Sequence, residues 1–217
     1  MAEISLSDKI YQDLKWSLIV GEYRPGDVLS IRKLAAKLDV SAMPVREALK
    51  RLATERLLVS AANKSYRIAD LDAERVSNQF FVRAEMEGIA TSLAAQKMTG
   101  KQIDQLIDLA EQMDKDVVEG DADNYFSRNY NFHFSIYAAS NNEELVWSIE
   151  RLWALTGPFL AEYVRSVEMS EMEPHWRALH KEIAKAIKSR NSELASKLIE
   201  EDISWGTNVF LDMVAKD

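Results

Sequence analysis

Apolar residues recur at helical spacing over three short segments in the first part of the chain. One runs from Ser7 to Val20, and the other two begin after Ser30 and Ser41, either of which can cap a helix. The turn Pro25-Gly26-Asp27 separates the first two, since proline presets φ and glycine tolerates the next position. Pro44 falls in the first turn of the third segment, where a missing N–H costs little. The pattern predicts three short helices.

Two short apolar runs follow these helices and have the composition of strands. They are Leu57 to Val59 and Tyr66 to Ile68, and a polar stretch separates them. Such a pair predicts a small β-hairpin. Three short helices followed by a hairpin predict a winged helix-turn-helix, with the hairpin as the wing and the third helix in the position that enters the major groove.

Beyond residue 70 the apolar spacing is helical throughout. Six segments joined by short polar stretches are predicted at about 72–97, 100–119, 122–139, 142–166, 171–189 and 192–215. The residues placed to cap four of them are Asp72, Thr99, Asp121 and Ser192. Long helices with short connections are typical of a helical bundle. We therefore expect a mainly α protein with a winged helix-turn-helix over residues 1–70 and an all-helical bundle over residues 71–217.

The composition supports a folded core and excludes several classes of site. Hydrophobic residues make up 47% of the 217 positions, and no apolar run approaches the roughly 20 residues of a membrane span. The chain has no cysteine, which excludes disulfides, zinc–thiolate sites and thiol nucleophiles. Its seven glycines form no phosphate-binding loop. We expect a cytoplasmic protein with no membrane partner.

The net charge of −8 conceals an asymmetry between the two predicted domains. Residues 1–70 hold 12 basic and 9 acidic residues, a balance of +3, whereas residues 71–217 hold 15 and 26, a balance of −11. Residues 28–69 alone have 9 basic and 3 acidic residues, or +6. A basic segment on an acidic body favours one polyanion-binding module, although a solvated charged face gives the same count.

The outward face of the third predicted helix carries the residues best suited to DNA. Arg46 and Lys50 lie one turn apart, so both can point into a major groove, where arginine can donate two hydrogen bonds to guanine. Basic residues that open the second helix or lie in the wing suit phosphates. The candidate contacts with a double-stranded DNA operator are Arg32, Lys33, Ser41, Met43, Arg46, Lys50, Arg51, Lys64 and Arg67.

The first domain resembles the GntR family of regulators in residues that follow one another over about 60 positions. Gly21 to Leu29 matches the family pattern G-x-x-x-P-G-x-x-L, and Leu34 to Leu52 matches the pattern L-A-x-x-x-x-V-S-R-x-P-V-R-E-A-L-x-x-L. One departure is Ala42, which stands where the family usually has arginine after the Val-Ser pair. The resemblance implies a homodimer that recognises a palindromic operator.

The second domain resembles the FCD effector-binding domain of the FadR-type branch of that family. Arg83 and Glu87 match its R-x-x-x-E helix, Asn129 and His133 match its [DN]-x-x-F-H helix, and His180 matches its H-x-x-I helix. In related domains an Asp or Asn and three histidines hold a metal. Here the fourth ligand position is occupied by Asp202.

A metal site can also be argued from the spacing of these residues. Asn129 and His133 are four apart on one helical face, and antiparallel packing of the last two helices would bring His180 level with Asp202. Two imidazoles with oxygen ligands suit Zn²⁺, Mn²⁺ or Ni²⁺, and aspartate shifts the preference toward harder ions. Asp202 is equally compatible with a site that has been lost, in which each histidine is a hydrogen-bonded helix residue.

Arg83 is the candidate effector-binding residue. It can capture a small carboxylate that also touches the metal, or it can pair with Glu87 at i+4. We expect a ligand-responsive transcriptional regulator, more specifically a repressor that a small organic acid controls. We do not expect an enzyme. The alternatives are a metal-dependent helical-bundle enzyme and a non-specific DNA-binding protein. The sequence lacks the H-E-x-x-H and G-x-S-x-G motifs that mark two common classes of enzyme.

Overall fold

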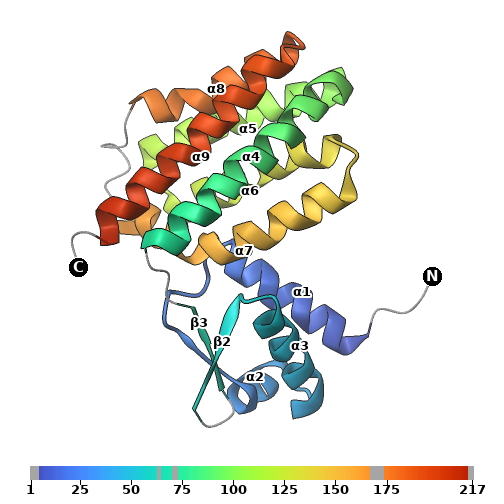
Figure 1. Ribbon diagram of the computed structural model, residues 1–217, viewed down its shortest axis with the longest axis vertical. Coiled ribbons are helices and arrows are strands. Elements are labelled where there is room, and N and C mark those ends of the chain that lie inside the picture. The colour runs from blue at the N-terminus through green and yellow to red at the C-terminus, as the bar shows by residue number, and fades with distance from the viewer. Residues whose placement is uncertain (1–4, 63–64, 70–72, 167–173, 215–217) are drawn as a thin grey trace. The chain divides into compact units, whose positions relative to one another are not determined.

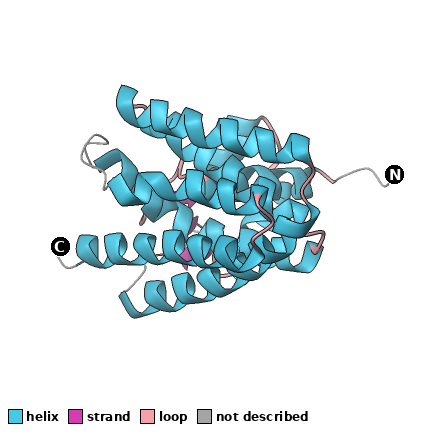
Figure 2. Ribbon diagram, turned by 90° about the horizontal axis from the view of Figure 1, so that it is seen from above, coloured by secondary structure: helices cyan, strands magenta, loops and turns pink. Residues whose placement is uncertain are grey.

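The computed structural model describes residues 5–62, 65–69, 73–166 and 174–214 (Figure 1). Over these residues the chain is almost entirely helical, and its strands belong to one small sheet (Figure 2). The chain forms two compact units, one of residues up to 71 with 153–159 and the other of residues 72–152 with 160–217. The predicted fold class, a winged helix-turn-helix and a helical bundle, is confirmed.

The N-terminal unit contains the three predicted helices and a three-stranded sheet. Its elements are α1 (Leu6–Ile19), β1 (Val28–Ser30), α2 (Ile31–Leu38), α3 (Ala42–Thr54), β2 (Leu58–Ala61) and β3 (Ser65–Ile68). The strand order is β1-β3-β2, and both pairs are antiparallel. Tyr66 on the central strand lies opposite Leu29 on one side and Ser60 on the other. The hairpin was expected, whereas β1 was not, because its three residues are too few for a visible alternation.

The core of this unit forms where α1 and α2 pack against α3. The apolar face of α3 is fully buried, as its spacing predicts, and the side chains of that face are Val45, Ala48, Leu49 and Leu52. Ser30 caps α2 by accepting a hydrogen bond from the backbone N–H of Lys33 at 3.4 Å. Burial of one face leaves the opposite face of α3 in solvent.

The C-terminal unit is a bundle of long helices. Its helices are α4 (Ala73–Lys97), α5 (Gly100–Glu119), α6 (Ala122–Ala139), α8 (Pro174–Lys188) and α9 (Ser192–Val214), together with the two ends of α7 (Glu143–Ser166), whose residues 153–159 belong to the N-terminal unit. Every described boundary lies within three residues of its predicted position. α4 and α9 lie side by side along most of their length (Figure 1), and α5 packs against both α6 and α8.

Small residues allow α4 and α9 to approach closely. A Cβ atom added to Gly88 on α4 would lie 2.5 Å from Oε1 of Glu200 and 2.9 Å from Oγ of Ser196, both on α9. A larger residue at position 88 would therefore displace the side chains of Glu200 and Ser196. Glu200 lies two residues before Asp202 on α9.

The helix caps agree with the sequence in two cases and differ in one. Thr99 and Gln102 form a reciprocal capping box at the start of α5, and Asp121 accepts from the backbone N–H of Asn124 at 3.0 Å. The predicted cap Ser192 is wrong: it is the first residue of α9, and the side chain of Asn191 accepts from the N–H of Leu194 at 3.1 Å. Asp72 lies outside the described residues.

A search of the described helices finds none that combines the length and the apolar character needed to cross a bilayer.

The buried face of α3 gives a direct test of the core of the N-terminal unit, which we call the head. Leu49→Ala should lower the free energy of unfolding by about 2–5 kcal/mol, because Leu49 is 0% exposed and its removal leaves a cavity. Chemical denaturation followed by circular dichroism would measure the change. Leu38→Ala, at a leucine of α2 that is 41% exposed, should alter it by about 0.5 kcal/mol or less. Equal effects of the two changes would contradict this packing.

Candidate functional site

The solvent face of α3 presents three of the side chains predicted to contact DNA. Met43, Arg46 and Lys50 are exposed and follow one another at intervals of three and four residues. Among the residues that the structure describes, none forms an ion pair or a hydrogen bond with the side chain of Arg46 or Lys50, and only the backbone carbonyl of Lys50 accepts from a side chain, the hydroxyl of Thr54. Their positive groups can therefore turn toward a polyanion without breaking an internal contact.

The N-terminal ends of α2 and α3 carry three further predicted residues. Arg32 and Lys33 are exposed in the first turn of α2, where the positive end of the helix dipole favours an anion. Ser41 precedes α3, and its exposed side chain makes no capping hydrogen bond. These three residues fit phosphate contacts.

Arg51 occupies a different environment from Arg46 and Lys50. Its guanidinium lies 3.7 Å from the centre of the Tyr11 ring, and its Nη1 is 3.1 Å from Oδ1 of Asp8. Its Nε is also 3.6 Å from Oε1 of Glu55. Arg51 thus joins α3 to α1, which is a structural role that the sequence did not indicate.

The wing accounts for the last two predicted contacts. Arg67 is half-buried on β3, where it lies opposite Val28 and Val59. Lys64 lies outside the described residues.

A cavity of about 310 Å³ lies between α3 and the wing, which is the hairpin of β2 and β3. Arg46 borders it on α3, and its remaining lining comes from α2, β2 and β3. The lining residues are Ile31, Arg46, Ser60, Ala61, Ser65 and Tyr66. Sequence reasoning missed the hydroxyl groups of this cavity, because serine and tyrosine in a short hairpin have no spacing that marks them.

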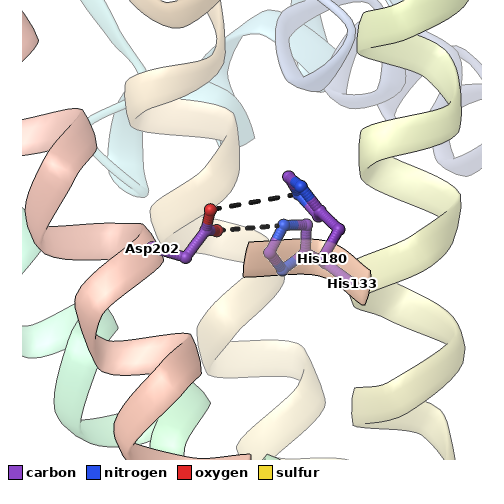
Figure 3. A group of neighbouring side chains, drawn as sticks. All are labelled: His133, His180 and Asp202. Atoms are coloured by element: carbon purple, nitrogen blue, oxygen red, sulfur yellow. Dashed lines mark ion pairs between the residues drawn. The ribbon is translucent and has the colours of Figure 1, made fainter. Parts of the chain in front are cut away.

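The predicted metal ligands meet inside the helical bundle. His133 Nε2 lies 3.3 Å from Oδ2 of Asp202, and His180 Nε2 lies 3.9 Å from Oδ1 of the same carboxylate. His180 Nε2 is also 3.0 Å from Oδ1 of Asn129. The Asp202 carboxylate faces both imidazole rings (Figure 3). Segments that are far apart in sequence, on α6, α8 and α9, therefore supply one cluster.

The spacing of this cluster fits a divalent metal. One ligand atom from each of His133, His180 and Asp202 lies within 4.8 Å of the others. Two ligands that each lie about 2.1 Å from one ion are separated by about 3–3.5 Å, close to the distances found here. Two imidazole nitrogens with carboxylate and amide oxygens could hold Zn²⁺, Mn²⁺ or Ni²⁺.

Burial keeps both imidazoles in the form that binds metals. His133 and His180 are almost completely buried, and desolvation lowers the pKa of His180 to about 4. Desolvation also lowers the pKa of His133 well below its usual value, with repulsion from His180 and Arg83 as further causes. Neutral imidazole is the ligand form, so neither ring needs to lose a proton at neutral pH.

Arg83 is buried beside this cluster and paired with Glu87. Its Nε donates to Oε1 of Glu87 at 2.7 Å, which is the i+4 ion pair that the sequence left open as an alternative. The hydroxyl of Tyr137 donates to the other oxygen of Glu87, and Nδ1 of His133 lies 2.9 Å from that hydroxyl. Sequence reasoning missed Tyr137, although its position four residues after His133 places it on the same helical face.

The third histidine of the chain lies elsewhere. His175 is exposed, and its Nε2 is 2.6 Å from Oε1 of Glu201. It can therefore serve as an internal control for the two buried histidines.

Two family models match the chain, in the order expected from its motifs. The model described as "Bacterial regulatory proteins, gntR family" matches residues 6–68, and the model described as "FCD domain" matches residues 79–204. The first implies DNA and the second implies a small-molecule effector as partners of this chain.

Curated and solved proteins of the same kind are similar over nearly the full length. The chain is 30% identical to the HTH-type transcriptional regulator McbR of Escherichia coli K12 over 89% of this chain and 87% of that protein. It is 29% identical to the HTH-type transcriptional repressor GlaR of the same bacterium over 89% and 90%. The solved structure of E. coli McbR matches with a TM-score of 0.91 at 26% identity, covering 98% of this chain and 100% of that one.

These matches confirm the predicted family, fold class and kind of function. The two domain models account for both compact units, and the relatives are regulators of transcription rather than enzymes. The chain belongs to the GntR family of bacterial regulatory proteins, in the branch that carries an FCD domain, and it is a ligand-responsive DNA-binding transcriptional regulator.

Proposed function

We propose that this protein is a cytoplasmic repressor that binds a palindromic operator as a homodimer and is controlled by a small organic acid. The observation that carries the proposal is the exposed basic face of α3, where Arg46 and Lys50 lack internal partners among the described residues. Operator binding by this face would be sequence-specific, because bidentate arginine contacts distinguish guanine from the other bases.

Each part of the head has a role in this proposal. α3 enters the major groove, with Arg46 and Lys50 toward base edges and Met43 against an apolar base edge. Arg32, Lys33 and Ser41 hold phosphates and so fix the register of α3. The hydroxyls of Ser60, Ser65 and Tyr66 around the cavity beside Arg46 are placed to contact the DNA backbone as well.

Replacing Arg46 tests this docking. Arg46→Ala should weaken binding to an operator selected from random-sequence DNA by about 5- to 150-fold, the equivalent of about 1–3 kcal/mol for a bidentate contact. A fluorescence anisotropy titration at fixed salt would measure the change, with circular dichroism to show that the variant is folded.

Lys9→Ala is the matched control, since it also removes one exposed positive charge but does so on α1. Lys9 follows Asp8, the residue that pairs with Arg51 of α3. It should leave the operator affinity within about twofold. Equal losses for the two variants would mean that only overall charge matters, and unchanged binding by Arg46→Ala would reject α3 as the reading helix.

The effector would bind at the buried cluster. A metal held by Asn129, His133, His180 and Asp202 would offer open coordination positions to a carboxylate. Arg83 adds positive charge beside the cluster, since its charge already lowers the pKa of His133. An anionic ligand therefore suits this site better than a neutral or cationic one.

The effector can control DNA binding only if it binds two arrangements of the dimer with different affinity. A coupling free energy of about 1–3 kcal/mol would change the operator affinity by about 5- to 150-fold. Contacts with the metal and with Arg83 would supply that difference if the helices that carry them shift relative to one another.

Metal analysis tests the cluster. The purified protein should contain about one first-row metal per chain, because one ligand atom from each of His133, His180 and Asp202 lies within 4.8 Å of the others, a spacing that small side-chain shifts would bring to that of a shared ion. Inductively coupled plasma mass spectrometry would measure the content. The His133→Ala, His180→Ala double variant should lose the metal.

His175→Ala is the control, because that histidine is exposed and paired with Glu201. It should retain the metal in full. An absence of metal from the wild-type protein, even after incubation with zinc, manganese and nickel, would mean that Asp202 marks a dismantled site.

An exposed apolar stripe on α4 supports the proposed homodimer. Val82 is 42% exposed, and Ile89 and Leu93 follow it seven and eleven residues later on the same helical face, away from the face of Gly88 that approaches α9. Exposed apolar side chains that gather on one face are typical of protein–protein interfaces. A symmetric dimer would pair this stripe with its own copy and carry two heads to the two halves of a palindrome.

A charge placed in the stripe should break the dimer. Ile89→Glu is expected to shift the protein to a monomer in sedimentation velocity experiments at micromolar concentration, because an unpaired carboxylate would be buried in the interface. Val118→Glu on α5, where the native valine is 80% exposed and has no apolar stripe around it, should leave the dimer intact. A dimeric Ile89→Glu variant would exclude this face.

A further inference from the structure

We propose that Tyr137 and Glu87 are positioning residues of the metal site, which hold His133 in the tautomer that presents an unprotonated Nε2 to the cluster. The inference rests on the proposed metal site and adds to it a chain of contacts that runs from α4 through α6.

The chain of contacts begins at Glu87, whose side chain is 0% exposed. Arg83 donates to its Oε1 at 2.7 Å, so the two side chains form a buried ion pair. A carboxylate has no hydrogen to donate. Every neighbour that approaches the other oxygen, Oε2, must therefore be a donor.

Two donors approach that oxygen: Nη2 of Arg83, at 3.5 Å, and the hydroxyl of Tyr137, which lies closer. Tyr137 is fully buried, and its hydroxyl group donates to Oε2 of Glu87 in a short hydrogen bond. A phenol has a single hydrogen, which this contact uses. The oxygen of Tyr137 can then act only as an acceptor toward any further partner.

That further partner is Nδ1 of His133, at 2.9 Å. Since the oxygen of Tyr137 can only accept, Nδ1 must carry the hydrogen. In a neutral imidazole the other nitrogen then carries the lone pair. The orientation of one hydroxyl group thus determines which nitrogen of His133 is free to bind a metal.

The free nitrogen points into the cluster. His133 Nε2 lies 3.3 Å from Oδ2 of Asp202, so a lone pair and a carboxylate oxygen face each other across a gap of the size that a shared ion would span. Metal-binding histidines commonly donate their other ring N–H to a fixed acceptor, which orients the ring and raises its basicity. Tyr137 provides that acceptor, and Glu87 fixes its direction.

The same contacts connect Arg83 to the metal site. Arg83 pairs with Glu87, Glu87 orients Tyr137, and Tyr137 orients His133, so the guanidinium acts on the metal site through two other side chains. The series of contacts extends over one buried face of α4 and one of α6, which pack against each other.

Nuclear magnetic resonance of the histidine rings tests the tautomer without any substitution. In the full-length protein at pH 7.5, with chelator present, long-range ¹H–¹⁵N spectra should show the His133 hydrogen on Nδ1. The chain has three histidines, so single His→Gln variants would assign the signals. Observation of the hydrogen on Nε2 alone would overturn the proposal.

The variant Tyr137→Phe removes the acceptor and keeps the ring. It should populate both tautomers of His133 and weaken zinc affinity by about 10- to 100-fold, measured by competition with a chromophoric chelator. Tyr130→Phe is the control: it removes a hydroxyl from the same helix, at a ring that stacks on Phe134, and should keep the wild-type tautomer and affinity. Circular dichroism would show that both variants are folded.

The two proposals fail in different ways. If the wild-type protein binds no zinc, the metal site is rejected, and the ring spectra of the same sample still report the tautomer. If the wild-type protein binds zinc and Tyr137→Phe binds it equally well with an unchanged His133 tautomer, the positioning role is rejected and the metal site stands. A tautomer change that accompanies a loss of affinity supports the positioning role.

Discussion

The burial of charge inside the helical bundle is the physical condition that the candidate site has to meet. Arg83 and Glu87 are both almost completely inaccessible, and the cost of removing two ions from water is offset only when each has close partners. A buried ion pair of this kind is weak evidence for stability, since an apolar pair of similar size can be equally stable. Loss of one partner is costly, however, at about 3–5 kcal/mol. We therefore interpret the Arg83–Glu87 pair as part of the polar cluster that surrounds it. Tyr137 connects the pair to His133, because its hydroxyl donates to Glu87 and contacts Nδ1 of His133.

The packing of α4 against α9 brings the two halves of this cluster together. Gly88 follows directly after Glu87, and its missing side chain allows α9 to approach. Asp202 lies two residues beyond Glu200, whose carboxylate occupies the space that a side chain at position 88 would need. The residue that permits close packing and the residue that accepts from Tyr137 are thus neighbours in sequence. A change in the distance between α4 and α9 would move the Asp202 carboxylate relative to His133.

Much of this structure could be predicted from the spacing of residues along the chain. Long amphipathic helices carry their boundaries in their apolar period, which is why the described helix bounds agree with prediction within three residues. The proximity of the candidate ligands could be predicted for the same reason, because the i+4 spacing of Asn129 and His133 and the antiparallel packing of the last helices place side chains predictably. β1 and the Asn191 cap were missed, since three residues show no alternation and Asn191 and Ser192 are both good caps.

The partners of individual polar side chains could not be predicted. Arg51 belongs to the same basic helix face as Lys50 in sequence, yet Tyr11, Asp8 and Glu55 surround its guanidinium. Those residues are about 40 positions away or on a neighbouring turn, and nothing in their type marks them as partners of an arginine. Tyr137 presents the same difficulty, since a tyrosine on a buried helix face is usually core packing. Its role depends on Glu87, 50 residues earlier.

The division of charge between the two domains has a consequence for specificity. Non-specific binding to DNA derives almost entirely from phosphate contacts, and it grows with the number of cations that a protein offers. Here the +6 of residues 28–69 is attached to a body of −11, so the protein as a whole repels DNA unless the head is seated. The base contacts of one short helix must then supply a large share of the binding free energy. The operator occupancy of such a protein responds strongly to a modest change in the placement of its two heads, because non-specific affinity for DNA contributes little to binding. A coupling of about 1–3 kcal/mol from a small ligand is then sufficient to decide whether an operator is occupied.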